Sequence, residues 1–276
     1  MNGSTTIAAV GWIGLGDQGA PMARAIAEAG YTLHVWARRP QSLEALGGVR
    51  YIAHESIAEL GAASDVVSIC LEEGCDIQEV LGSGGLWASL KPGSVIINHG
   101  TGLPQFAIEL AARGAERGIT VLDAPVSRGH PGALARQLTT IVGGDKAVAE
   151  RLTPLFKTFS QKVAYIGSAG SGQTAKLISD ALLILNQEKP RTHSAWCGIV
   201  AALIDLLLSG TGSSFPLQAL LGTVAPDNTV APDNAERLKV LQVIETETLK
   251  ATMDALGQRT AQIWARALQA QTACPT

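Results

Sequence analysis

The chain has few charged residues and no strong excess of one sign. Of its 276 residues, 16% are charged, and the formal net charge is -3. Nucleic acids and anionic membrane surfaces are bound through concentrated positive charge, which this composition does not provide. We therefore expect partners that are neither nucleic acid nor membrane.

Cysteine and long apolar runs are also scarce. The longest later apolar run, residues 196–208, contains Asp205 and is too short to span a bilayer. The N-terminus lacks the basic and apolar regions of a signal peptide. The cysteines show neither paired nor metal-ligand spacing, so we expect no disulfide framework, no metal and a cytoplasmic location; they are Cys70, Cys75, Cys197 and Cys274.

Short β-branched runs alternate with alanine-rich helical patterns over roughly the first 165 residues, as is typical of a parallel sheet covered on both faces. Helices are expected at residues 21–29, 103–117 and 146–158. This pattern predicts an α/β fold, a Rossmann-type doubly wound parallel sheet at residues 1–167, followed by an all-helical domain at residues 168–276. The seven expected strands are TIAAVGWI, YTLHVWA, DVVSICL, GSVIIN, ITVLDAP, QLTTIVGG and KVAYIG.

A glycine-rich turn follows the first expected strand directly. Gly14 allows the tight turn, Gly16 lets backbone amides approach a pyrophosphate, and Gly19 lets the next helix pack closely. The helix N-terminus then favours the anion. This strand–turn–helix context predicts a dinucleotide site, in which the intervening Leu15, Asp17 and Gln18 also take part.

Two arginines follow the second expected strand. A site for NAD usually has an acidic residue at this point for the ribose hydroxyls, whereas Arg38 and Arg39 suit the 2′-phosphate of NADP. NADP is therefore the expected cofactor, with NAD less favoured. Two solvated surface arginines are the alternative.

Two opposite charges interrupt an apolar segment near residue 180. Lys176 and Asp180 are four residues apart, so they share one face of the expected helix. An almost wholly apolar helix is buried, and buried charges are paired or functional. The spacing leaves both a structural ion pair and a catalytic lysine open.

Four motifs in this order resemble the β-hydroxyacid dehydrogenase family: GLGDQGAPMA, LDAPVSRG, LTTIVGGD and GSGQTAKLISD. The family includes 3-hydroxyisobutyrate dehydrogenase and the tartronate semialdehyde and glyoxylate reductases. The resemblance implies NAD(P)-dependent interconversion of a small β-hydroxyacid and its oxo form, with Lys176 as the acid or base. It implies that Ser127, Arg128 and Gly129 bind the substrate carboxylate, and that Leu71 and Thr101 lie near the nicotinamide.

The departures from the family pattern are as informative as the matches. Arg128 replaces a glycine in the substrate loop, and Asn98–Thr101 reads NHGT in place of D-x-S-T. Asp180 replaces an asparagine that contacts substrate. Because a carboxylate beside an ammonium favours the charged lysine, we expect the enzyme to favour reduction with NADPH.

Two other functions remain open. The first is an imine reductase, which shares the architecture but normally lacks the lysine. The second is a dinucleotide-binding protein that has lost catalysis. His99 and His130, expected on loops at one sheet edge, would assist catalysis or be solvated. By analogy with the family, we expect a homodimer or homotetramer acting on a small carboxylate substrate.

Overall fold

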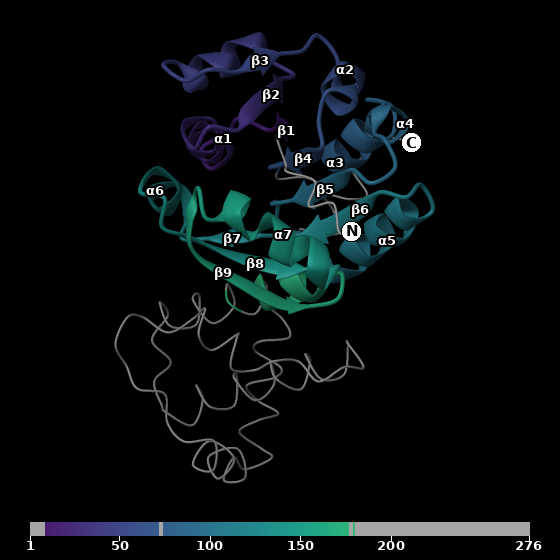
Figure 1. Ribbon diagram of the computed structural model, residues 1–276. Coiled ribbons are helices and arrows are strands. Elements are labelled where there is room, and N and C mark those ends of the chain that lie inside the picture. Colours follow the sequence, from purple (N-terminus) through teal and green to yellow (C-terminus); the bar gives the residue numbers. More distant parts are fainter. Residues whose placement is uncertain (1–8, 72–73, 177–178, 180–276) are drawn as a thin grey trace, which may run out of the picture. The chain divides into compact units, whose positions relative to one another are not determined.

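The computed structural model describes residues 9–71, 74–176 and 179 (Figure 1). The chain divides into two compact units, Met1–Lys176 and Leu177–Thr276, and the first contains all but one of the described residues. The expected all-helical domain and Asp180 therefore lie outside the described residues. Among the described residues, no helix has the length and apolarity needed to cross a membrane.

Nine strands form one sheet in this part of the chain, in the order β3-β2-β1-β4-β5-β6-β8-β7, with β9 paired to β8. Neighbours from β3 to β6 are parallel, as are β8 and β9, whereas β8 is antiparallel to β6 and β7. The strands are β1 (Ala9–Ile13), β2 (Thr32–Trp36), β3 (Ile52–Ala53), β4 (Val66–Ile69), β5 (Val95–Asn98), β6 (Thr120–Asp123), β7 (Val126–Ser127), β8 (Leu138–Gly143) and β9 (Ser160–Gly167).

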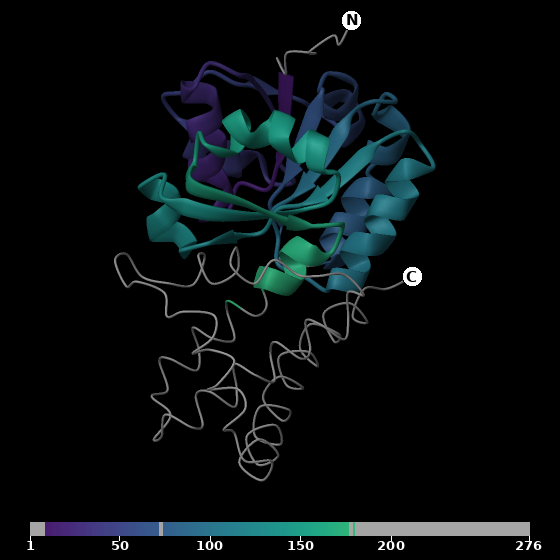
Figure 2. The ribbon, with the colours of Figure 1, turned by 60° about the horizontal axis from the view of Figure 1, so that its bottom comes forward.

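Helices cover both faces of the sheet. One buried cluster contains apolar residues of α1 and α7, and a second contains those of α2, α3, α4 and α5. Figure 2 shows α1 (purple) and α5 (blue-teal) on opposite sides of the strands. The helices are α1 (Gly19–Glu28), the 3-10 helix η1 (Pro40–Leu46), α2 (Ile57–Ala62), α3 (Gly74–Leu81), α4 (Leu86–Ser89), α5 (Pro104–Ala115), α6 (Gly129–Leu134) and α7 (Lys146–Phe156).

The predicted Rossmann-type fold is confirmed in this unit, and each of the seven expected strands is present. The purely parallel sheet is a simplification, because β8 runs antiparallel to β6 through the pair Asp123 and Gly143. The two-residue strands β3 and β7 were not expected from the sequence. A segment of two residues is too short to show the alternation that indicates a strand.

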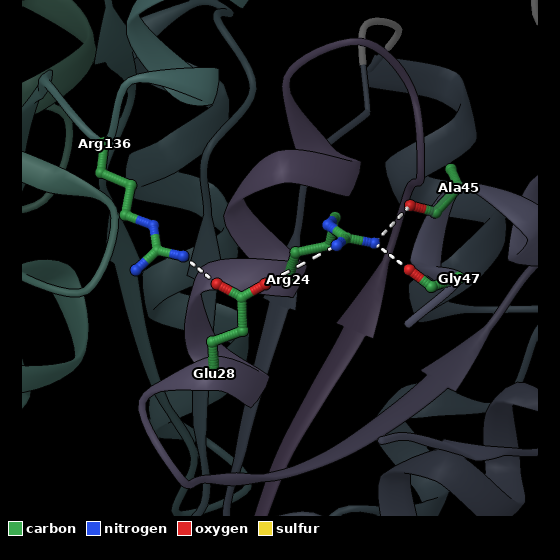
Figure 3. Close-up of polar contacts among 5 residues, drawn as sticks. All are labelled: Arg24, Glu28, Ala45, Gly47 and Arg136. Carbon is green, nitrogen blue, oxygen red and sulfur yellow. Dashed lines mark hydrogen bonds and ion pairs between the residues drawn. The ribbon is translucent and has the colours of Figure 1, made fainter. Parts of the chain in front are cut away.

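A polar network fixes α6 and the η1 segment to α1 (Figure 3). Glu28, the last residue of α1, forms ion pairs with Arg24 and with Arg136, which follows α6. Arg24 in turn donates hydrogen bonds to the carbonyl oxygens of Ala45 and Gly47. Segments more than 100 positions apart are therefore joined beside the helix that follows the glycine-rich turn.

Candidate functional site: a cavity at the carboxyl edge of the sheet

Three loops meet at one edge of the sheet because the central strands are parallel and in register. Ile13 of β1 pairs with Ile69 of β4, and Ile69 pairs with Asn98 of β5. The segments that follow these strands, which begin at Gly14, Cys70 and His99, therefore emerge side by side. In open α/β sheets, ligands bind in this crevice at the carboxyl ends of the strands.

The glycine-rich turn has the geometry of an anion cradle. Gly14 has a φ of +101°, and a Cβ there would lie 2.1 Å from the carbonyl oxygen of Cys70. A Cβ on Gly19 would lie 2.1 Å from the carbonyl oxygen of Gly14, whereas a Cβ on Gly16 would meet nothing within 4 Å. The turn is thus packed at its first and third glycines and open at the second. Gln18, the N-cap of α1, makes no side-chain capping bond, so the structure fits a phosphate at this helix N-terminus.

A cavity of about 470 Å³ lies against this turn. It brings together six of the ten residues predicted to bind the cofactor: Gly16, Asp17, Gln18, Gly19, Leu71 and Thr101. Cys70, His99, Gly100 and His130 complete its lining. The lining does not include Gly14, Leu15, Arg38, Arg39 or the predicted substrate loop. The described residues contain no group of three His, Cys, Asp or Glu side chains suited to a metal ion.

His99 is a buried residue, and the solvated alternative considered for it is wrong. Its side chain is enclosed, with the ring stacked on Trp12 at 5.5 Å between centroids. Nδ1 lies 3.0 Å from the carbonyl oxygen of Ala124, and because a carbonyl only accepts, Nδ1 holds a proton. Nε2 lies 3.3 Å from the hydroxyl of Ser68. Burial lowers the pKa of His99 to about 4. The imidazole stacked on Trp12 is therefore neutral at neutral pH.

Trp12 contacts the turn directly. Its indole Nε1 donates a hydrogen bond of 2.8 Å to the carbonyl oxygen of Gly14. The indole is fully buried and also packs edge-on against Phe159. The first glycine of the turn is therefore fixed by a buried aromatic cluster, which pre-organises the cradle before any ligand binds.

The predicted substrate loop is fixed beside the glycine-rich turn. His130 lies in α6, not on a loop, and its Nδ1 donates a 2.6 Å hydrogen bond to the carbonyl oxygen of Asp17. Arg128, the N-cap of α6, has a φ of +83°. This is a conformation that glycine adopts freely and that costs other residues about 1 kcal/mol or more. The neighbouring Gly132 accommodates it, because a Cβ on Gly132 would lie 2.5 Å from that of Arg128.

Lys176 lies in a helical segment, residues 171–176, whose start is anchored to the end of β6. Asp123 accepts hydrogen bonds of 2.9 Å from the backbone amides of Gly170 and Gln173. Burial raises the pKa of Asp123, and these hydrogen bonds oppose the rise. The Lys176 residue is 8% exposed. A carboxylate from the sheet thus caps the helix that presents the predicted acid or base.

Gln173 connects this helix to the cavity wall, a role that the sequence did not reveal. The side chain is buried, and its Nε2 donates to the carbonyl oxygen of Gly100 at 2.7 Å. Its Oε1 accepts from the amide of Gly102 at 2.9 Å. Thr101, which lines the cavity, lies between these two anchored glycines. The glutamine stands in the motif that contains Lys176, but motif position alone does not indicate a partner some 70 residues earlier.

Arg38 and Arg39 differ in their surroundings. The guanidinium of Arg38 forms ion pairs with Asp76 at 3.0 Å and with Glu79 at 2.7 Å, both on α3. Arg39, the N-cap of η1, is exposed. Both arginines are exposed, so the alternative of two solvated surface arginines stays open, although Arg38 is paired with acids. Their role toward a cofactor remains a prediction.

Comparison with known proteins agrees with this geometry. The family described as the NAD binding domain of 6-phosphogluconate dehydrogenase matches residues 9–167. The 2-hydroxy-3-oxopropionate reductase of Escherichia coli (strain K12) is 36% identical over 217 residues, which cover 78% of this chain and 71% of that protein. The part of the chain that the structure describes is thus an NAD-binding domain.

Two further relatives show the extent of the similarity. The NAD-dependent L-serine dehydrogenase of Pseudomonas aeruginosa (strain PAO1) is 35% identical over 175 residues, 63% of this chain and 59% of that protein. The chain therefore matches less than two thirds of the length of this relative. A solved structure of Mycobacterium tuberculosis 3-hydroxyisobutyrate dehydrogenase with L-serine is 20% identical, with a TM-score of 0.58, and covers 91% of this chain and 99% of its own. At that identity, the likeness concerns the fold.

Proposed function

Because the chain belongs to the β-hydroxyacid dehydrogenase family, we propose that it is an NADP-dependent oxidoreductase that interconverts a small β-hydroxyacid and its oxo or semialdehyde form. The observation that supports this most directly is the cavity at the carboxyl edge of the sheet, where the glycine-rich turn meets the wall that contains Thr101. The nicotinamide, when bound, supplies or accepts the hydride. The remaining chemistry falls to residues of this chain.

Lys176 is the proposed acid or base. In its ammonium form it donates a proton from Nζ to the carbonyl oxygen during reduction, and in its neutral form it accepts the hydroxyl proton during oxidation. Its burial supports this role, because a buried lysine is retained when it is paired or functional. Asp180, four residues later in the sequence, lies outside the described residues. The proposal is that its carboxylate favours the ammonium form and hence the reductive direction.

The substrate is proposed to be a small carboxylate held by Ser127, Arg128 and Gly129. Arg128 supports this choice, because a strained, exposed arginine at a position suited to glycine is explained by a use for its charge. The cofactor preference for NADP is supported by Arg38 and Arg39 after β2. A homodimer or homotetramer, by analogy with the family, and a cytoplasmic location, from the absence of paired cysteine spacing, complete the proposal.

An NADPH-oxidation assay of the full chain tests this function. The panel would contain glyoxylate, succinic semialdehyde, methylmalonate semialdehyde and tartronate semialdehyde, with L-serine and 3-hydroxyisobutyrate assayed in the oxidative direction. Turnover of at least one oxo-acid is expected, and Lys176→Ala should reduce kcat by about 100-fold or more while leaving NADPH binding intact. Binding of NADPH with no turnover would favour a non-catalytic dinucleotide-binding protein. Reduction of cyclic imines alone would favour an imine reductase.

The predicted direction is tested separately with Asp180→Asn. If the carboxylate favours the charged lysine, the variant should gain oxidative activity at neutral pH, and the lower limb of its oxidative pH–rate profile should move to lower pH. Asp145→Asn, which alters a helix cap on α7, is the matched control. Profiles in both directions that coincide with those of the parent would refute the role given to Asp180.

A further inference from the structure

The acidic residue that an NAD site usually has at the end of the second strand is missing, but two acids reach the same place from another element. Trp36 ends β2 and pairs with Ile13, directly before the glycine-rich turn. Arg38 therefore emerges at the same edge as the turn, where the residue that follows the second strand meets the adenosine ribose. The chain places Ala37, Arg38 and Arg39 there, none of which is acidic.

Both terminal nitrogens of the Arg38 guanidinium are engaged. Nη1 lies 3.0 Å from Oδ1 of Asp76, and Nη2 lies 2.7 Å from Oε2 of Glu79. The two acids are three residues apart on α3 and hence on one helix face. The side chains are 54%, 32% and 57% exposed for Arg38, Asp76 and Glu79. The cluster is thus open to a ligand from solvent, and its ion pairs are individually weak.

We infer that Asp76 and Glu79 set the choice between NAD and NADP by competing with the 2′-phosphate for Arg38. This inference rests on the proposed dinucleotide function and extends it. A 2′-phosphate must displace two carboxylates from the guanidinium or lie beside them, and like charges at such distances repel. A 2′-hydroxyl has no charge and can donate to a carboxylate, so NAD meets no such penalty.

The two arginines therefore have different roles toward the cofactor. No ion pair joins Arg39 to another described residue, so its guanidinium is available for a phosphate at once. Arg38 binds the 2′-phosphate only after Asp76 and Glu79 release its guanidinium. The acids lower the affinity for NADP below what two arginines would give, and they leave the affinity for NAD almost unchanged.

Binding of the two adenosine halves to the full-length protein tests this inference without requiring turnover. Adenosine 2′,5′-bisphosphate represents the NADP half and 5′-AMP the NAD half, with both affinities measured by calorimetry at low salt. The double variant Asp76→Asn/Glu79→Gln should bind the bisphosphate about tenfold more tightly and 5′-AMP within about twofold of the parent. Because the cluster is exposed, the gain should shrink as salt rises.

Two further variants separate the local effect from a general change in charge. Glu150→Gln removes a carboxylate of similar exposure from a remote ion pair with Lys146, and it should leave both affinities unchanged. Adding Arg38→Gln to the double variant should abolish the gain. A gain that persists without Arg38, a similar gain in Glu150→Gln, or parallel changes for both ligands would overturn the inference. Failure of the parent to bind either ligand would refute the dinucleotide site and, with it, this inference.

Discussion

Acid should destabilise the described domain through His99. The folded protein holds this imidazole neutral because burial lowers its pKa to about 4, whereas an unfolded chain gives histidine a pKa of about 6.5. Between these values the unfolded state binds more protons than the folded state, so stability falls as pH falls. The contribution of His99 is complete above about pH 7 and is lost progressively toward pH 4.

The size of the effect follows from the two pKa values. Protonation of the unfolded chain at pH 5, with little protonation of the folded protein, lowers the free energy of unfolding by about 2 kcal/mol relative to pH 8. His34 acts in the same direction, because burial and the nearby His54 lower its pKa. A single pH series on the parent protein therefore cannot isolate His99.

The comparison of the parent with His99→Asn isolates it. The asparagine amide can still donate to the carbonyl of Ala124, but it does not titrate, and His34 is present in both proteins. Urea denaturation followed by circular dichroism between pH 8 and pH 5 should show the parent losing about 2 kcal/mol more than the variant. The stack on Trp12 is lost in the variant, so its stability at pH 8 should also be lower.

A direct titration protects the test against a variant that does not fold. The imidazole signals of His99 in the parent, followed by NMR, should titrate with a midpoint near pH 4. A midpoint near 6.5, or equal losses of stability in parent and variant, would show that the buried neutral imidazole is not the source of the acid sensitivity.

Two further predictions concern the cavity. Gly19→Ala should destabilise the domain by about 2 kcal/mol or more, because its Cβ would lie 2.1 Å from a backbone oxygen. Gly16→Ala should instead leave stability unchanged and weaken dinucleotide binding. Thermal melts and calorimetry would distinguish the two variants, and equal melting temperatures would contradict the packing argument. Gln173→Leu should remove both bonds to the Gly100–Gly102 segment and accelerate amide hydrogen exchange there; unchanged exchange would show that the glutamine does not hold this wall.

The sequence predicted the strands and the glycine-rich turn well, because the sequence patterns that indicate them are local. The β-branched runs located seven strands, and the G-x-G-x-x-G turn located the cradle, because each pattern lies within a short window. The direction of β8 was not predictable from the sequence. The chain between β6 and β8 includes β7 and α6, and this order of elements does not show whether β8 runs parallel or antiparallel to β6. The antiparallel pair Asp123 and Gly143 appears only in three dimensions.

The candidate site was predicted in part for the same reason. Gly16, Asp17 and Thr101 belong to motifs, and the structure places them around one cavity. The support behind that cavity depends on partners remote in sequence: His99 with Ser68, and Gln173 with Gly100. A single histidine or glutamine in the sequence does not identify such a partner, so these residues were missed or misjudged.

The ion pair between Arg136 and Glu28 bears on how this protein can be recombined with its relatives. The segment from Ser127 to Arg136 contains the predicted substrate loop and α6, and it would be the natural piece to exchange when a different substrate is sought. Its arginine, however, finds its acid at the end of α1. A transplanted segment would bring an arginine without an acid into any host that lacks one at the matching position, so a working chimera needs both exchanges together.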